Sequence, residues 1–226
     1  MEEQHKRKVR SYVLRAGRMS ELQKRALETL SSDYIIPYNA SPVDPTAIFG
    51  LQKVVVEIGF GMGIATAIMA EEHPHTGFLG IEVHSQGVGK LLSEIEKRGL
   101  RNIRILRHDA VEVFQYMIPP ASLDGINIFF PDPWPKKRHH KRRLLQPEFA
   151  LLLADRLKPG GTLRLATDWD EYARWILDVL SGIPGLENCF KDYADSTLGR
   201  PETKFEQRGR AEQRVIRDIC FRRRTE

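Results

Sequence analysis

The chain has 226 residues, which is enough for one large α/β domain with a buried core. Hydrophobic residues make up 41% and charged residues 29%, a balance typical of soluble proteins, and no apolar run is long enough to span a membrane. The N-terminal MEEQHKRKVR lacks the apolar core of a secretory signal, and the two cysteines, Cys189 and Cys220, lack metal-ligand spacing. We therefore expect a cytoplasmic protein with no membrane partner and no bound metal.

The net charge of +5 is modest, and its distribution is more informative than its size. Basic residues gather near the N-terminus (Lys6 to Arg18), at Lys136 to Arg143, and near the C-terminus (Arg208 to Arg224). A single charge run is usually a solvated surface. Three separate clusters indicate a nucleic-acid partner.

Residues 1–50 are expected to form a basic irregular arm over 1–19, a short helix and a connector. Ser20 and Gln23 make a capping-box pattern, which predicts that a helix begins there. The helix would pack on the main domain through an apolar stripe formed by Leu22, Ala26, Leu27 and Leu30. Prolines predict an extended connector over 31–50.

Residues 51–226 alternate strands with helices, which predicts a mostly parallel sheet covered on both faces. The expected strands are 54–59, 78–83, 103–106, 126–130, 162–167, 186–192 and 215–221. Helices are predicted over 65–72, from a Ser85 cap to Gly99, and from Pro147 to the KPGG turn at 158–161. Another helix carries the stripe Tyr172, Trp175, Ile176 and Val179. The polar segment before the last strand is expected to be a long loop, and loops of that length are usually either functional or disordered.

Three glycines, Gly59, Gly61 and Gly63, separate the first strand from the first helix. Glycine lets a backbone approach a ligand closely at a helix N-terminus. Glu82, at the end of the next strand, is placed to accept both ribose hydroxyls of a nucleoside. Ile64 replaces the last glycine of the dinucleotide fingerprint and would crowd a pyrophosphate, which disfavours a nicotinamide oxidoreductase.

Two further carboxylates complete this end of the sheet. Asp109 is placed to accept from an adenine amino group, although it could simply cap the helix starting near Ala110. Glu57 lies inside a buried strand, where a carboxylate is costly unless a partner such as a ligand ammonium is present. Together with the glycines and Glu82, they predict S-adenosylmethionine as the cofactor.

The stretch FFPDPWPKKRHHKRR (129–143) follows the fourth strand. Asp132 follows strand four and Asp168 follows strand five; if those strands are neighbours, their ends lie about 5 Å apart. The two carboxylates could hold the ring N–H and exocyclic amine of a guanine. Turn chemistry alone also explains Asp132, and Asp168 is equally well placed to cap the next helix. Trp134 either stacks on the base or forms a wall of the pocket, or else it packs against the turn.

The basic run after this turn is suited to grip phosphates. Lys136 lies closest to the turn and is the best candidate to touch the substrate nucleotide. Further phosphate contacts are expected from three arginines of the late loop, Arg200, Arg208 and Arg210.

These motifs resemble those of the bacterial tRNA (guanine-N7-)-methyltransferases over nearly the whole chain. They are EIGFGMG (57–63), FLGIEVH (78–84), HDAVEV (108–113), FFPDPWPKKRHHKRR (129–143), ATDW (166–169) and TKFEQRG (203–209). The resemblance implies a class I S-adenosylmethionine-dependent methyltransferase (Rossmann-like) fold, with a mostly parallel seven-stranded sheet completed by an antiparallel strand. It also implies methylation of N7 of a guanine in the variable loop of tRNA, which yields 7-methylguanosine and S-adenosylhomocysteine.

Residue roles follow from matching positions in that family, with Asp132 as the catalytic residue. The cofactor would be surrounded by Glu57, Gly59, Gly61, Gly63, Glu82, Asp109 and Asp132. The substrate would contact Lys136, Asp168, Thr203, Lys204, Phe205 and Glu206. The RNA would contact Arg138, His139, His140, Lys141, Arg142 and Arg143.

The expected chemistry needs few catalytic groups. Guanine N7 has a free lone pair and no proton, so we expect Asp132 to position the base and balance the cationic product. Two other functions remain open, a methyltransferase for an exocyclic amine and a non-catalytic RNA-binding protein on the same fold. The sequence leaves open which tRNAs are used and whether the chain is a monomer or a homodimer.

Overall fold

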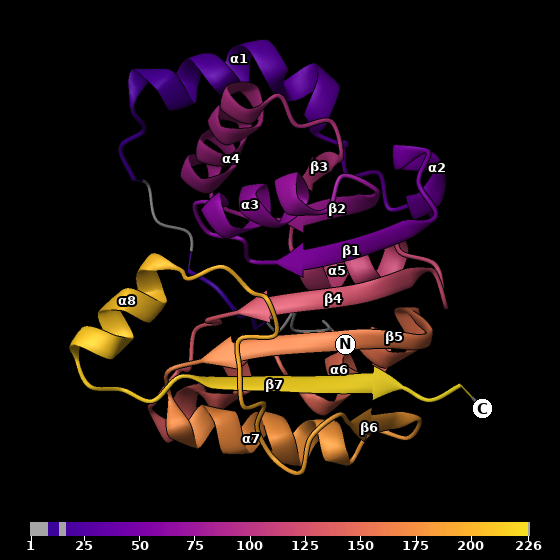
Figure 1. Cartoon of the computed structure of the whole chain (residues 1–226), viewed down its shortest axis with the longest axis vertical. Coiled ribbons are helices and arrows are strands. Elements are labelled where there is room, and N and C mark those ends of the chain that lie inside the picture. Colours follow the sequence, from indigo (N-terminus) through magenta and orange to yellow (C-terminus); the bar gives the residue numbers. More distant parts are fainter. Residues whose placement is uncertain (1–8, 14–16, 226) are drawn as a thin grey trace, which may run out of the picture.

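A computed structural model describes residues 9–13 and 17–225, so 1–8 and 14–16 of the predicted arm lie outside the described residues. The described chain forms a single sheet ordered β3-β2-β1-β4-β5-β7-β6 (Figure 1). Its strands are β1 (Lys53–Ile58), β2 (Thr76–Ile81), β3 (Ile103–Leu106), β4 (Leu123–Phe129), β5 (Leu157–Thr167), β6 (Leu186–Asn188) and β7 (Arg217–Arg223).

The pairings confirm the predicted sheet. β1 pairs in parallel with β2 and β4, and only β7 runs antiparallel to its neighbours, β5 and β6. Because the chain leaves β1 toward β2 and later returns to β4 on the other side, a crevice is expected at the carboxyl ends of β1 and β4. Within the described residues, no helix has the length and apolar character needed to cross a membrane, and no acidic, His or Cys side chains converge as a metal site would.

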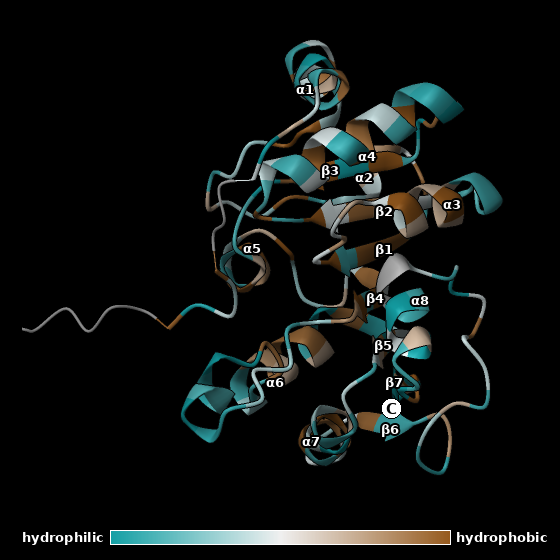
Figure 2. Ribbon diagram, turned by 90° about the vertical axis from the view of Figure 1, so that its left-hand side faces the viewer, coloured by the Kyte–Doolittle hydropathy of each residue, from teal (hydrophilic) through white to brown (hydrophobic). Residues whose placement is uncertain are grey.

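Helices cover both faces of the sheet (Figures 1 and 2). One face carries α1 (Glu21–Tyr34), α3 (Ile64–Glu72) and α4 (Ser85–Arg98); the other carries α5 (Ala110–Tyr116), α6 (Pro147–Arg156) and α7 (Asp170–Ser181). Two hydrophobic clusters form the core, one under each set of helices. The short elements are α2 (Pro45–Phe49), the 3-10 helix η1 (Lys137–Arg142) and α8 (Lys204–Ala211). α8 lies beyond the carboxyl ends of β1, β4 and β5 (Figure 1).

The N-terminal helix begins as predicted. Ser20 N–H donates to Gln23 Oε1 at 2.7 Å, and Gln23 N–H donates to the Ser20 hydroxyl at 3.3 Å. α1 packs on α4 with Ala26 fully buried. The predicted stripe is wrong at Leu22, which is 53% exposed, because Gln23 turns inward and donates to Gln86 O instead.

Several predicted boundaries are corrected. The extended connector predicted over 31–50 is wrong at both ends. At its start α1 continues to Tyr34, and at its end Asp44 caps the short α2 by accepting from Thr46 N–H. α4 begins one residue earlier than expected, with His84 and not Ser85 at the cap. The KPGG segment, predicted as a turn before the fifth strand, lies within β5, whose pairing with β4 shifts register between Leu123 and Gly125. The late polar loop contains α8, which Thr203 caps.

The packing of α4 on the glycine turn can be tested with Gly87→Ala. An added Cβ would lie 2.0 Å from the Gly61 carbonyl oxygen, so we expect a loss of about 1–3 kcal/mol despite the better helix propensity of alanine. The measurement is urea unfolding of both proteins. Gly182→Ala is the control, because its φ is −81° and its nearest contact would be 3.5 Å. A Gly87→Ala protein as stable as the control would contradict this packing.

Candidate functional site

A cavity of about 500 Å³ opens at the carboxyl ends of β1 and β4. This volume lies in the range of small-molecule sites. Its wall brings together residues from the first strand, the glycine turn, the end of β2 and the Pro-Asp-Pro-Trp turn. Among the predicted site residues, the wall contains Glu57, Gly59, Gly61, Gly63, Glu82, Asp132 and Thr203.

The three glycines of the turn all have a left-handed backbone. Their φ values are 72° at Gly59, 56° at Gly61 and 70° at Gly63, a region that residues with a Cβ avoid. A Cβ at Gly59 or Gly61 would meet no protein atom within 4 Å, so the backbone there borders open space. A Cβ at Gly63 would lie 2.6 Å from Leu91 Cβ, so this glycine also permits the packing of α4.

Glu82 closes the turn from the end of β2. Its Oε2 accepts from Gly61 N–H at 3.0 Å, and its Oε1 accepts from Val83 and His84 N–H at 2.7 and 3.0 Å. Three backbone donors therefore fix this buried carboxylate at the cavity wall. A carboxylate held in this way is suited to accept hydrogen bonds from a ligand's hydroxyls.

Glu57 is 3% exposed and also borders the cavity. Burial raises the pKa of its carboxyl to about 7, against the lowering effect of the hydrogen bond that Thr66 Oγ1 donates at 2.8 Å. The charge of Glu82 raises the pKa further. No ion pair to Glu57 is found among the described residues. A ligand cation in the cavity would therefore have an uncompensated partner.

Asp109 takes the ordinary role foreseen for it, as the cap of α5. Its Oδ1 accepts from Val111 N–H at 2.9 Å. It lies in the wall of a smaller neighbouring cavity of about 310 Å³, while His108 and Ala110 on either side border the large one. Burial and the nearby Asp109 carboxylate raise the pKa of the Tyr12 phenol, which sits at the same edge.

The Pro-Asp-Pro-Trp turn brings Asp132 to the cavity. β4 and β5 are neighbours, as the prediction required, with Phe129 paired to Ala166. Asp132 is exposed at the cavity wall, and Phe130 and Trp134 on either side have φ values of 52° and 45°. Such values are unfavourable for bulky residues and mark a backbone that its surroundings hold in place.

Trp134 packs against other parts of the chain and lies outside the cavity wall. Its Nε1 donates to Ser11 O at 3.1 Å. The Arg142 guanidinium lies 3.9 Å from its ring centroid and donates to Arg10 O and Tyr12 O. In this structure the ring therefore packs against Arg142 and the N-terminal segment.

Asp168 does not cap α7. The cap residue is Trp169, and it makes no side-chain capping bond. Asp168 Oδ2 instead accepts from Arg214 Nη1 at 2.7 Å, and Gly209 of α8 packs closely against it. The helix-cap prediction is therefore wrong, and the carboxylate lies beside α8.

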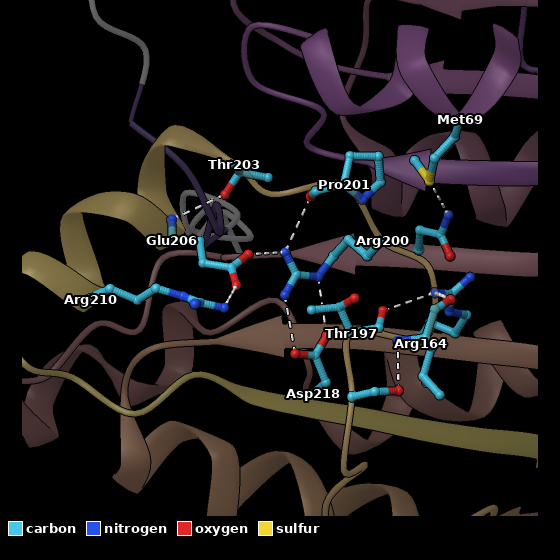
Figure 3. A network of polar contacts seen from close by, with 12 residues as sticks. Met69, Arg164, Thr197, Arg200, Pro201, Thr203, Glu206, Arg210 and Asp218 are labelled. Carbon is cyan, nitrogen blue, oxygen red and sulfur yellow. Dashed lines mark hydrogen bonds and ion pairs between the residues drawn. The ribbon is translucent and has the colours of Figure 1, made fainter. Parts of the chain in front are cut away.

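A buried polar network anchors the start of α8 (Figure 3). Glu206 is fully buried between Arg200 and Arg210, and Arg200 also donates to both carboxylate oxygens of Asp218 at 3.1 Å. The predicted phosphate contact is wrong for Arg200, whose side chain is enclosed. Thr203, the cap of α8, borders the cavity, whereas the side chains of residues 204–205 lie outside the described residues.

The basic run divides into outward and inward residues. The outward residues are exposed and will be called the outer basic residues: Lys136, Lys137, Arg138 and Lys141. His139 and His140 are half-buried, and burial together with neighbouring cations lowers the pKa of His139. Arg142 holds the N-terminal segment, and Arg143 is 1% exposed. The predicted RNA contact is therefore wrong for Arg143.

Comparison with known proteins places the chain in a family. A family model described as "Putative methyltransferase" matches residues 51–219. The tRNA (guanine-N(7)-)-methyltransferase of Nitrosospira multiformis is 52% identical, over 96% of this chain and 95% of the relative. The enzyme of the same name from Burkholderia cenocepacia is 52% identical, over 98% of this chain and 88% of its own. The chain belongs to the tRNA (guanine-N(7)-)-methyltransferase family.

A solved structure supports the fold independently of this family. The 16S rRNA methyltransferase KamB is only 16% identical, yet it aligns over 93% of this chain and 96% of its own with a TM-score of 0.57. The predicted class I methyltransferase fold is thereby confirmed.

Sequence reasoning missed several residues of the cavity wall in this family member. Ser11 and Tyr12 of the wall come from the N-terminal segment. This segment is fixed by Trp134, which bonds Ser11 from 123 residues further along the chain. No local pattern signals such a contact. His108, which stacks on Tyr38 at 3.6 Å and bonds Glu112 at 2.7 Å, could have been found from its place beside Asp109.

Because the pKa of Glu57 is raised, the free energy of unfolding should depend on pH. Because the folded protein keeps this proton up to about pH 7, while an unfolded glutamate loses it near 4.5, stability falls as the pH rises through that window. We expect Glu57→Gln to remove up to about 3 kcal/mol of this pH-dependent loss. Urea unfolding of the ligand-free proteins near pH 5 and pH 8 measures it. Parallel pH profiles for the two proteins would contradict the assignment.

Proposed function

We propose that this chain transfers the methyl group of S-adenosylmethionine to N7 of a guanine in the variable loop of tRNA, in the cytoplasm, forming 7-methylguanosine. The observation that carries the proposal is the cavity at β1 and β4, which brings Glu57, Glu82 and Asp132 together in one wall. The outer basic residues follow Asp132 closely in the chain. Membership of the tRNA (guanine-N(7)-)-methyltransferase family supports the same reaction.

The residues of the cavity fit the proposed cofactor. Glu57 is buried with no ion pair among the described residues and would hold the ammonium group. Glu82, fixed by three backbone donors, would accept the ribose hydroxyls. The edge formed by His108 and Ala110 would border the adenine, with Asp109 behind it. When bound, the cofactor supplies a methyl group on a sulfonium, which needs no further activation.

The protein's part in the reaction is alignment and charge balance. Guanine N7 has no proton to remove, so Asp132 at the cavity wall would orient the base and offset the positive charge that develops on it. Holding nucleophile and methyl donor in line can lower the barrier by up to about 7–11 kcal/mol in ideal cases. Thr203 borders the cavity, whereas Lys136 and Asp168 follow β4 and β5 in the chain; all three are proposed to contact the substrate nucleotide. Glu206 is buried and would contribute indirectly, because its bonds to Arg200 and Arg210 hold α8 in place.

The outer basic residues are proposed to bind the phosphates of the tRNA. They project from η1, directly after the turn that carries Asp132. Such contacts act on the nucleic-acid backbone and set position more than sequence preference. A non-catalytic RNA-binding role is less well supported, because Glu57, Glu82, Asp132 and the three glycines lie in one cavity wall.

The proposal is tested by incubating the protein with methyl-labelled S-adenosylmethionine and bulk tRNA that lacks 7-methylguanosine, then identifying the labelled nucleoside after digestion. We expect label in 7-methylguanosine, and a loss of about 10²-fold or more in kcat for Asp132→Ala because a preorganised charge is removed. Asp33→Ala, an exposed residue of α1, is the control and should keep full activity.

Other outcomes separate the alternatives. Label on an exocyclic amine would keep the fold and cofactor but assign a different target atom. Tight tRNA binding without label, in a protein that binds S-adenosylhomocysteine, would contradict the proposed reaction and support a non-catalytic RNA-binding role.

A further inference from the structure

Arg143, the last residue of the basic run, is enclosed by protein. Its side chain has no exposed surface, and it is among the largest fully buried side chains of the described chain. A buried guanidinium is costly unless its donors are satisfied by well-placed acceptors. Its partners should therefore reveal what it does.

The guanidinium joins the Pro-Asp-Pro-Trp turn to α7. Its Nε donates to Pro133 O at 3.0 Å, and that carbonyl belongs to the residue directly after Asp132. Nη1 and Nη2 donate to the two carboxylate oxygens of Glu171 at 3.1 and 2.5 Å. Nη2 also lies 3.1 Å from His140 Nε2. This fork is a geometry that arginine provides and lysine does not.

Aromatic residues of α7 enclose the same group. The guanidinium carbon lies 5.0 Å from the Tyr172 ring centroid and 5.1 Å from that of Trp175. Trp175 Nε1 also donates to Leu145 O at 2.9 Å, just after Arg143. The chain on both sides of the basic run is therefore attached to one helix.

The position of Asp132 depends on the attachment of its turn to α7. Its carboxylate makes no hydrogen bond or ion pair with the described residues, so the backbone of the turn sets its position. That backbone includes two bulky residues with left-handed φ values, Phe130 and Trp134. A strained backbone stays in place only when its surroundings fix it.

We propose that Arg143 is a positioning residue, which holds the turn so that Asp132 stays at the cavity wall, and that it does not bind tRNA phosphate. The effect on the reaction rests on the proposed function. The proposal divides the basic run, because the outer basic residues serve the RNA while Arg143 serves the catalytic turn.

The test compares Arg143→Lys and Glu171→Gln with two controls. We expect Arg143→Lys to lower kcat at saturating tRNA by about 10–100-fold while the dependence of tRNA binding on salt keeps its slope. Glu171→Gln should lower kcat in the same direction, and the double variant should be no worse than Arg143→Lys, because both residues act through one contact. Arg138→Gln, a phosphate-contact control, should raise KM for tRNA and reduce the salt slope by about 0.7–0.9.

Arg174→Gln is the second control, because it removes a different arginine, one that forms an ion pair on the exposed side of α7. Arg174 is exposed and pairs with Asp170, so its removal should leave both kcat and the salt slope unchanged. A slope reduced by about one phosphate in Arg143→Lys, with kcat preserved, would overturn the proposal. If Arg143→Lys does not fold, Glu171→Gln decides, because Glu171 is 51% exposed: a lowered kcat at wild-type Tm supports the proposal, and an unchanged kcat overturns it.

A second readout does not depend on activity. A turn released from α7 should be cut faster by trypsin after Lys136 and Lys137, so we expect faster cleavage there in Glu171→Gln than in Arg174→Gln. Equal cleavage would overturn the positioning role. If wild-type protein forms no 7-methylguanosine, the proposed function fails, and the cleavage comparison still decides whether Arg143 holds the turn.

Discussion

A carboxylate buried in the first strand is the constraint on which the cofactor end of this protein depends. Glu57 is paired in the sheet with Gly80 and Asn127, and its carboxylate accepts a hydrogen bond from the Thr66 hydroxyl. Burial raises its pKa to about 7, which destabilises the charged form in the free protein. A ligand ammonium close to Glu57 would stabilise the charged carboxylate and so offset the cost of burying it. Without a ligand, this residue therefore makes the folded protein less stable as the pH rises toward 7.

The second organising feature is the separation of similar basic residues by burial. Arg143 and Arg200 lie in basic or polar segments, yet both are enclosed and each bridges a carboxylate to a loop at the cavity edge. Arg143 holds the turn of Asp132, and Arg200 holds the start of α8 with Thr203. Neighbours such as Arg138 stay exposed, which leaves them accessible for the RNA contacts proposed above. Burial therefore separates the arginines that fix the edges of the cavity from those that stay exposed.

The features that were predictable from sequence are those that short-range patterns encode. The strand–glycine–helix unit, the capping box at Ser20 and the placement of Glu57, Glu82 and Asp132 in one wall follow from periodicity and topology. The features that were missed depend on contacts between distant segments. Nothing local distinguishes Arg143 from Arg138, because burial by α7 decides the difference. α8 was missed because its polar sequence has no buried stripe, and its stability comes from the Thr203 cap and the Arg200 network.

The central claim is that this cavity aligns a methyl donor with N7 of one guanine in the variable loop. The most direct measurement is to treat tRNA methylated by the wild-type protein with borohydride and aniline, which cleave the chain at 7-methylguanosine, and to map the cut. We expect one new cut, in the variable loop, that is absent after treatment with Asp132→Ala. Methylated tRNA that stays uncut, or is cut elsewhere, would contradict it.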